Sequence, residues 1–381
     1  MLWFWVLVIP ALALALLSLR RERARAAYWK EGVSHARKER RLPPATVIVP
    51  VKGPEEGLPE NLAALASLDY PDYELIVAAR APADIPDGAV PAQARIVLAG
   101  EGRGDTSEKI ENLLAAVAAA RPASEIFAFA DSDGRPGSLW LRALVAGLSG
   151  ERTGASTGYR WHLPQPPDFC SLARSAWNAV IAGRFGAGPC DFAWGGAMAI
   201  RRRDFERLRV AEFWRGSLSD DYRLSDAVRE AGLEIRFAPG ALTASIDHTG
   251  PGEFFGWIRR QMILTRVHRP KLWWYALVAH LVYCAATTAC VVEVTRGGWA
   301  GLGALPAIWG FGMWKGARRA RLAALALPEQ ERWFRRHGRA YAWLTPLATW
   351  LWLYSSLASA FAREIEWRGR RYRLGGSRRP G

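Results

Sequence analysis

Cysteine is scarce in this chain, with four cysteines among 381 residues. No Cys-x-x-Cys pair and no Cys/His spacing typical of a zinc site is present, which excludes a structural zinc module. Cys170 and Cys190 fall in the globular middle of the chain, whereas Cys284 and Cys290 fall in an apolar segment. The cysteines therefore predict neither a metal site nor a disulfide framework.

Acidic residues are also few, with 36 Asp and Glu against 51 Lys and Arg, a net charge of +15. Residues 20–41 and 315–340 each carry a net charge of +6, and residues 363–381 carry +5. The rest of the chain is therefore close to neutral, and the positive charge lies in three short stretches and not on a domain face. This distribution argues against nucleic acid as a partner.

Each basic stretch borders an apolar one. Residues 2–19 contain no charged residue and are long enough to cross a bilayer. No positive residues precede this run, as they would in a signal peptide, and Arg20, Arg21, Arg23 and Arg25 follow it. We expect an N-terminal transmembrane anchor at 1–20 and a basic juxtamembrane linker at 21–44, with the next domain on the cytoplasmic side.

Three more apolar stretches, 272–293, 298–314 and 341–362, are candidate membrane segments around a basic loop at 315–340. Buried core helices are the alternative, most of all for 298–314, which Gly and Pro interrupt. Three crossings would place the basic tail 363–381 outside, whereas positive residues favour the inside. Either 298–314 does not cross or one segment is re-entrant, and both alternatives stay open.

Residues 45–250 alternate short apolar runs with helical patterns. Strands are expected at Thr46–Val51, Glu74–Ala79, Arg95–Leu98 and Glu125–Ala130, and helices at Leu58–Leu68, Thr106–Ala120 and Ser138–Leu148. Continuous apolar strands separated by amphipathic helices predict an α/β domain with a Rossmann-like, mostly parallel sheet. Ligands of such sheets bind at the carboxyl ends of the strands.

Asp131 and Asp133 lie at such an end, directly after the strand 125–130. Two carboxylates in this position offer hard oxygen ligands to Mg²⁺ or Mn²⁺, and both ions commonly bind substrate phosphates. A calcium loop would need Gly and Glu where the chain has Pro136 and Arg142, so that site is excluded. A plain acidic turn is the remaining alternative.

A second acidic pair, Asp220 and Asp221, opens a helical run that Ser219 is placed to cap. Acidic residues favour a helix N-terminus in any case, which is the structural alternative. Trp194-Gly195-Gly196 precedes a strand-like run, and adjacent glycines permit close approach to a ligand or form a tight turn.

Residues 251–270 predict an amphipathic interfacial helix. Phe254, Ile258 and Met262 recur at helical spacing, with Arg259, Arg260, Arg266 and Arg269 beside them. These arginines suit a membrane surface or a diphosphate. A solvated basic face is the alternative.

In order, these motifs resemble a known family. The matching stretches are VPVKG (49–53), LASLDYPDYELIV (65–77), EKIENL (108–113), FADSDG (129–134), WGGAMAIRR (194–202), LSDDYRLSDAVREAG (218–232) and RRQMILTR (259–266). From about Val47 to Arg269 the chain resembles membrane-anchored family 2 glycosyltransferases with a GT-A fold, and more narrowly the ceramide glucosyltransferase group.

The resemblance implies roles for the matching residues. Asp131 and Asp133 would engage the metal and the donor diphosphate, and Asp221 would be the catalytic base with Asp220 beside it. Donor binding is expected from Lys109, Lys52, Arg259, Arg260 and Gln261, and acceptor binding from Trp194, Gly195 and Gly196.

Two departures from the family pattern stand out. Where the family has an aspartate after the second strand, the chain has Ala79-Arg80-Ala81, and the nearest carboxylate is Asp84. The R-x-x-R-W motif appears as Arg260-Gln261-Met262-Ile263-Leu264 and lacks its final Arg-Trp. The first departure concerns recognition of the nucleotide base, and the second argues against a processive polysaccharide synthase.

The resemblance and the apolar segments together predict a multi-pass membrane enzyme. We expect inverting, metal-dependent transfer of a hexose, glucose from UDP-glucose, to a lipid acceptor such as ceramide at the cytoplasmic membrane face. The predicted partners are a nucleotide-sugar donor, a lipid acceptor and the bilayer. The alternatives are a polyprenyl-phosphate or polysaccharide sugar transferase and a non-catalytic membrane scaffold with a degenerate donor site.

Overall fold

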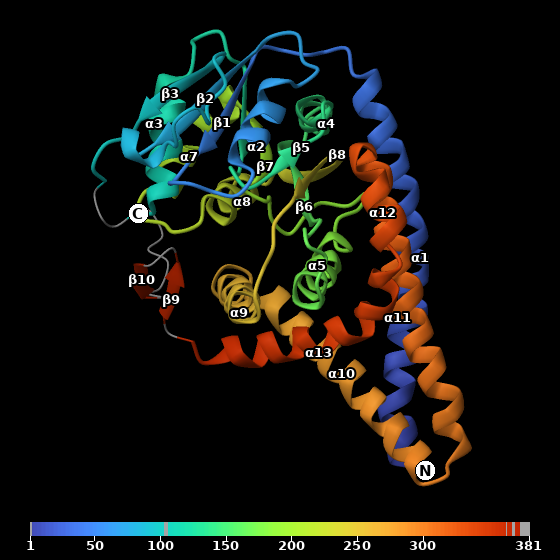
Figure 1. Ribbon diagram of the computed structural model, residues 1–381. Coiled ribbons are helices and arrows are strands. Elements are labelled where there is room, and N and C mark those ends of the chain that lie inside the picture. Colours follow the sequence, from blue (N-terminus) through green and yellow to red (C-terminus); the bar gives the residue numbers. More distant parts are fainter. Residues whose placement is uncertain (1, 103–105, 363, 368–369, 374–381) are drawn as a thin grey trace.

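An eight-stranded mixed sheet lies at the centre of the computed structural model, which describes residues 2–102, 106–362, 364–367 and 370–373 (Figure 1). The strand order is β3-β2-β1-β4-β7-β6-β8-β5. The strands are β1 (Ala45–Pro50), β2 (Tyr73–Ala79), β3 (Ala94–Leu98), β4 (Ile126–Ala130), β5 (Arg135–Pro136), β6 (Thr153–His162), β7 (Ala197–Arg201) and β8 (Glu234–Ser245).

Strand directions divide the sheet into two parts. The four strands predicted from the sequence, β1 to β4, are parallel to one another, which confirms that part of the prediction. Strand β7 runs antiparallel to both β4 and β6, and β5 runs antiparallel to β8, whereas β6 and β8 are parallel. The sheet is therefore mixed.

Helices cover both faces of the sheet (Figure 1). On β1, Val47 and Val49 face α2 (Leu58–Ala66) and α4 (Trp140–Gly147) in one core cluster. Ile48 points to the other face, where it belongs to the cluster of α3 (Glu108–Ala119), α6 (Arg202–Arg207), α7 (Val210–Trp214) and α8 (Asp220–Glu230). Burying one such aliphatic side chain contributes about 1.5–3 kcal/mol.

The first helix, α1 (Leu2–Lys38), is continuous through residues 21–38, which were expected to be a linker. Its second half docks on the sheet domain. Trp29 packs 5.1 Å from Phe237, measured between ring centroids, and its indole N–H donates to the carbonyl of Phe185. The segment predicted to be an anchor and the sheet domain are therefore joined by one helix.

Helices α1, α10 (Pro270–Thr295) and α11 (Trp299–Ala326) project together away from the domain, and the N-terminus lies at the far tip (Figure 1). Phe4, Val8, Ala289 and Ile308 pack together in this projection. By length and composition, α1 and α10 are long and apolar enough to cross a membrane.

Four further helices complete the described part of the fold. They are α5 (Phe169–Ala182), α9 (Pro251–His268), α12 (Glu331–His337) and α13 (Ala340–Ala360), with 3₁₀ turns η1 (Pro82–Asp84) and η2 (Pro328–Gln330). Helix α13 runs across the base of the domain instead of along the projecting helices (Figure 1). The segment 315–340, expected to be a loop, is mostly helical.

Part of the basic tail forms a small hairpin of β9 (Glu364–Trp367) and β10 (Arg370–Arg373), which pair antiparallel. The other residues of the segment 363–381 lie outside the described residues.

Candidate active site

A cavity of about 550 Å³ opens at the carboxyl ends of β1 and β4. Its polar end is lined by Lys52, Lys109, Asp131, Asp133, Arg160, Trp194, Asp220 and Asp221. Every residue in that list except Arg160 was a candidate from the sequence alone. Residues from 52 to 221 converge there because β1 and β4 are neighbouring parallel strands, and α3 and α8 lie on the same face of the sheet.

Lys109 connects the two acidic pairs. Its Nζ atom lies 2.7 Å from Oδ1 of Asp131 and 3.1 Å from Oδ2 of Asp220. Burial alone would lower the pKa of Lys109, but the charges of Asp131 and Asp220 raise it above its ordinary value. Lys109 therefore stays protonated and holds carboxylates from β4 and α8 together.

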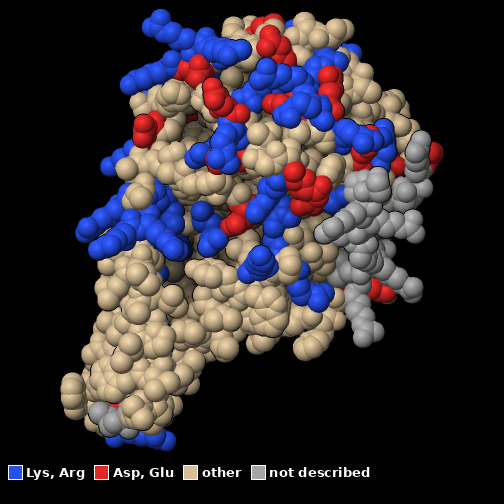
Figure 2. Space-filling view, turned by 180° about the vertical axis from the view of Figure 1, so that it is seen from behind, with Lys and Arg blue, Asp and Glu red and all other residues tan. Residues whose placement is uncertain are grey.

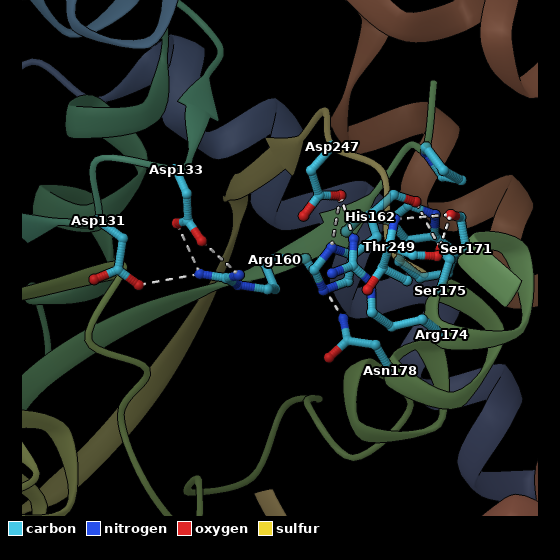
Figure 3. A network of polar contacts seen from close by, with 12 residues as sticks. Asp131, Asp133, Arg160, His162, Ser171, Arg174, Ser175, Asn178, Asp247 and Thr249 are labelled. Carbon is cyan, nitrogen blue, oxygen red and sulfur yellow. Dashed lines mark hydrogen bonds and ion pairs between the residues drawn. The ribbon is translucent and has the colours of Figure 1, made fainter. Parts of the chain in front are cut away.

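Arg160, on β6, makes a second cationic bridge across the other side of Asp131 (Figure 3). Its two terminal nitrogens each lie 3.0 Å from an oxygen of Asp133, and one of them also lies 3.1 Å from Oδ2 of Asp131. The guanidinium lies over the ring of Trp194, with Cζ 4.8 Å from the ring centroid.

The N-terminus of α8 presents Asp220 and Asp221. Ser219 caps the helix, as predicted, because its hydroxyl accepts from the backbone N–H of Tyr222. Oδ1 of Asp221 accepts from Ser219 Oγ and from the Tyr222 N–H, the latter at 2.7 Å. Among the described residues, Oδ2 of Asp221 has no hydrogen-bond or ion-pair partner. One oxygen is thus fixed, and the other can accept a proton.

Asp220 is more deeply placed, with 3% of its surface exposed. Burial raises its pKa to about 6, against the opposing charge of Lys109, and the carboxylates of Asp221 and Asp131 add to the rise. Among the described ion pairs, Lys109 and Arg160 bridge Asp131, Asp133 and Asp220.

Gly195 and Gly196 lie directly behind these carboxylates. A Cβ atom on Gly195 would come within 3.0 Å of Lys109 Nζ and still closer to Asp220 Oδ2. A Cβ atom on Gly196 would lie 2.6 Å from Asp131 Oδ2. Both glycines are absent from the cavity lining, whereas the neighbouring Trp194 is part of it. The glycine pair therefore makes room for the acidic side chains.

Some of the predicted donor-binding residues line the cavity and others do not. Arg260 and Gln261 of α9 line the cavity. Arg259 is exposed on α9 and is not part of that lining. Lys52 lines the cavity and pairs with Glu108 at 2.8 Å.

The region of the missing family aspartate does not line the cavity. The carboxylate of Asp84 accepts from the backbone N–H of Ala81 at 3.2 Å, and Arg80 pairs with Glu101. Neither Arg80 nor Asp84 belongs to the described cavity lining. Asp84 therefore closes a local turn.

A second polar network surrounds Asp247 (Figure 3). Asp247 pairs with the buried Arg174 of α5 and lies 3.4 Å from Nδ1 of His162. Burial lowers the pKa of His162 to about 4, and the charge of Arg174 adds to the shift. Arg174 and Asp247 both line the cavity.

Sequence reasoning missed Arg160, Arg174 and Asp247. Arg160 stands alone between two aromatic residues in the strand-like run 155–163, and a lone charge in such a run is the signal that would have indicated it. Arg174 and Asp247 carry no comparable signal because only the packing of α5 against β6, and the pairing of β6 with β8, bring them to the cavity.

The chemistry of these side chains fits a divalent metal. Four carboxylates lie at the polar end of the cavity and offer hard oxygen ligands to such an ion. Within the described parts of the chain, no three Asp, Glu, His or Cys side chains are grouped closely enough to enclose an ion. The residues therefore fit an open site that a substrate diphosphate and water would complete, which is common for Mg²⁺.

An α/β domain with paired carboxylates and cations at its strand ends is suited to a transferase whose substrate carries a phosphate group. The chain belongs to glycosyl transferase family 21, whose family model matches residues 3–379. Family 21 includes ceramide glucosyltransferase, which agrees with the narrower resemblance seen in the sequence. No curated protein matches the chain.

Several solved structures are similar to this chain. The mannosyltransferase PcManGT from Pyrobaculum calidifontis, in complex with GDP-Man and Mn²⁺, has 19% identity and a TM-score of 0.45, covering 89% of this chain and 99% of its own. The glucosyl-3-phosphoglycerate synthase of Mycobacterium tuberculosis, with Mn²⁺ and UDP-glucose, has 18% identity and a TM-score of 0.37, and the match covers 62% of this chain and 82% of the synthase. GalNAc-T7 with UDP, GalNAc and Mn²⁺ has 11% identity and a TM-score of 0.43, and the match covers 64% of this chain and 51% of GalNAc-T7.

Proposed function

We propose that this glycosyltransferase moves a hexose from a nucleotide diphosphate sugar, UDP-glucose in the simplest case, to the hydroxyl group of a membrane lipid such as ceramide. The domain has the GT-A arrangement in this proposal, and the reaction inverts the anomeric centre. The family supports sugar transfer. The acceptor class is our inference from the shape and lining of the cavity.

The observation that carries the proposal is the two-sided lining of one cavity. At one end are the carboxylates Asp131, Asp133, Asp220 and Asp221. At the other end are apolar and aromatic side chains of α5, α9, α10 and α13, among them Ile181, Trp257, Leu264, Leu272, Ala276, Ala279 and Trp352. A soluble sugar or phosphoglycerate acceptor has no use for such a surface, whereas a lipid chain does.

Asp221 is the proposed general base. The acceptor O–H gives its proton to Oδ2 of Asp221 while the acceptor oxygen bonds to the anomeric carbon. The bond from that carbon to the diphosphate breaks, and the nucleoside diphosphate leaves with the electron pair. Ser219 and the Tyr222 N–H hold Oδ1, so the carboxylate is oriented before substrate arrives.

Negative charge develops on the leaving diphosphate. Lys109, Lys52 and Arg260 line the cavity and supply positive charge to it. A bound Mg²⁺ or Mn²⁺, held by Asp131 and Asp133, would supply further positive charge at the same group. No protonating acid is required, because a diphosphate leaves readily with this support.

The projecting helices support a membrane location. The stretches 2–19, 272–292 and 299–314 of α1, α10 and α11 contain no Asp, Glu, Lys or Arg. Figure 2 shows the same feature on one face: charge is missing along the length of the projection except at its tip, and Lys and Arg gather where it joins the domain. An 18-residue helix spans about 27 Å, close to the thickness of a bilayer core.

In our proposal α10 and α11 cross as a hairpin, and α9 and α13 lie on the membrane surface. The domain and the tail 363–381 then share the cytoplasmic side, and the conflict over the basic tail disappears. Two single-cysteine variants, Trp299→Cys at the tip and Glu56→Cys on the domain, can be made in a protein without the four native cysteines. An impermeant thiol reagent should label them from opposite sides of the membrane. Labelling of both from one side would contradict this arrangement.

A scaffold without catalysis is disfavoured by the intact polar site. A scaffold does not need four carboxylates beside buried cations. Well-packed apolar side chains would stabilise the same fold at least as well. A polyprenyl-phosphate acceptor is the remaining alternative, since it also carries a long apolar chain.

Membranes containing the chain, incubated with labelled UDP-glucose, GDP-mannose and UDP-N-acetylgalactosamine, test the proposal. We expect label from one donor in the organic extract, in an alkali-stable neutral lipid if the acceptor is ceramide-like. Addition of EDTA should abolish it, and excess Mn²⁺ should restore it. Label in a soluble polymer alone, or in no product with any donor, would contradict the proposal. Label in an anionic, acid-labile lipid would favour the polyprenyl-phosphate alternative.

A further inference from the structure

Arg160 occupies the space between the two carboxylates expected to hold the metal (Figure 3). It contacts both oxygens of Asp133 and one oxygen of Asp131 at 3.0–3.1 Å, and its side chain is 12% exposed. These contacts form the planar, two-pronged pairing that a guanidinium makes with carboxylates.

The position of Arg160 is fixed from three sides. Its backbone carbonyl accepts a hydrogen bond from Asn178 Nδ2 at 3.1 Å. Its guanidinium lies over Trp194, whose own backbone N–H donates to Thr157 Oγ1 at 2.8 Å. The strand β6 itself pairs with β7 and β8. Arg160 is therefore built into the wall of the cavity and is not a surface arginine that happens to reach Asp133.

The α9 motif supplies no cation at the place where the family pattern has Arg-Trp. Ile263 is buried and Leu264 contributes an apolar side chain to the cavity. Arg160 lines the same cavity from β6. A guanidinium recognises phosphate with the same two-pronged geometry that it uses for carboxylate.

We propose that Arg160 is a donor-site cation with two successive partners. Without substrate it neutralises Asp131 and Asp133 and holds them in place. When Mn²⁺ and the nucleotide sugar bind, it yields these carboxylates to the metal and pairs with the donor diphosphate. This inference rests on the proposed function, because it requires a diphosphate donor.

The two roles predict effects of opposite sign on two affinities. Removing the charge of Arg160 eliminates a cation that competes with the metal for Asp131 and Asp133, so Mn²⁺ alone should bind more tightly. The same change removes a charged contact to the diphosphate, so the nucleotide should bind more weakly. An arginine that only supports the fold would lower both affinities together.

Full-length protein in detergent allows both affinities to be measured. Electron paramagnetic resonance gives the free Mn²⁺ concentration without nucleotide, and calorimetry gives the Kd of UDP and of GDP at saturating Mn²⁺. For Arg160→Gln we expect Mn²⁺ to bind about tenfold more tightly and the nucleotide about 10- to 100-fold more weakly, the range for one charge-assisted hydrogen bond. Arg160→Lys keeps the charge without the fork and should shift both values in the same directions by less.

Arg184→Gln is the matched control. Arg184 also lines the cavity, but it pairs with Asp191 and not with Asp131 or Asp133. Its loss should leave both affinities within about twofold of the wild type, as expected for an exposed ion pair. If Arg160→Gln does not fold, Arg160→Lys carries the test.

The results separate this inference from the proposed function. Wild-type protein that binds Mn²⁺ but neither UDP nor GDP overturns both. Wild-type protein that binds nucleotide, with Arg160 variants that lose both affinities together or change neither, overturns the role of Arg160 alone. Opposite changes in the two affinities support it.

Discussion

Gly196 lies so close to Asp131 that a Cβ atom added to the glycine would be 2.6 Å from Oδ2 of the aspartate. The ring of Trp194 would also clash with that atom. The glycine at this position is therefore part of the geometry that places Asp131 at the mouth of β4. Gly195 has the same relation to Asp220.

Gly196→Ala should consequently displace Asp131 and impair donor binding. Overpacking of this kind costs about 1–3 kcal/mol. We expect a lower midpoint of thermal unfolding and weaker binding of Mn²⁺ with UDP, both measured in detergent. Gly188→Ala is the control, because nothing lies within 4 Å of its added Cβ atom. Equal behaviour of the two variants would show that the close approach to Asp131 is unimportant.

The first half of the domain was predictable because its signals are local. The expected strands Thr46–Val51 and Glu125–Ala130 are apolar after their first residue, and they form β1 and β4 with bounds that differ by at most one residue. Ser219 before two acidic residues correctly indicated the start of α8. Local sequence also placed Asp131 and Asp133 at a strand end.

The parts that sequence reasoning missed depend on distant contacts. Antiparallel pairing of β7 between β4 and β6 brings Arg160 to Asp131, 29 residues away along the chain. The course of α1 past residue 20 depends on docking of Trp29 against Phe237, and its run of charges suggested a linker instead. No periodicity in the sequence reports either contact.

Acid should destabilise the protein through His162. Burial holds the pKa of His162 at about 4 in the folded chain, below its ordinary value of 6.5. Between these values the unfolded chain binds a proton that the folded chain does not, so stability falls as pH drops from 6.5 toward 4. The loss reaches about 3 kcal/mol at the low end.

Thermal unfolding in detergent from pH 4 to pH 7 measures this effect. His162→Asn retains a donor toward Asp247 but does not titrate, and its unfolding midpoint should fall less steeply with acid than that of the wild type. Parallel curves for the two proteins would show that His162 does not bind its proton on unfolding.

The apolar end of the cavity should determine which lengths of acceptor chain the enzyme binds. Ala279 of α10 lines that end, and Ala279→Trp would fill part of it. We expect the KM for a long-chain acceptor to rise by about tenfold, the scale on which pockets discriminate apolar groups. A short-chain acceptor that does not reach Ala279 should keep its KM.

Val278→Trp makes the same change on the neighbouring residue, which is exposed and does not line the cavity. It should leave both KM values unchanged. If Ala279→Trp slowed both acceptors equally, the lipid would not occupy this part of the cavity.

The role of Asp221 is the central claim of this account. Transfer of labelled sugar to membrane lipid, measured for the wild type and Asp221→Asn alongside the Kd of the nucleotide with Mn²⁺, tests it most directly. Loss of general-base catalysis predicts a kcat about 10²- to 10⁴-fold lower, with the nucleotide Kd within about twofold of the wild type because Asp131, Lys109 and Arg160 are untouched. Full transfer activity in Asp221→Asn would contradict the assignment.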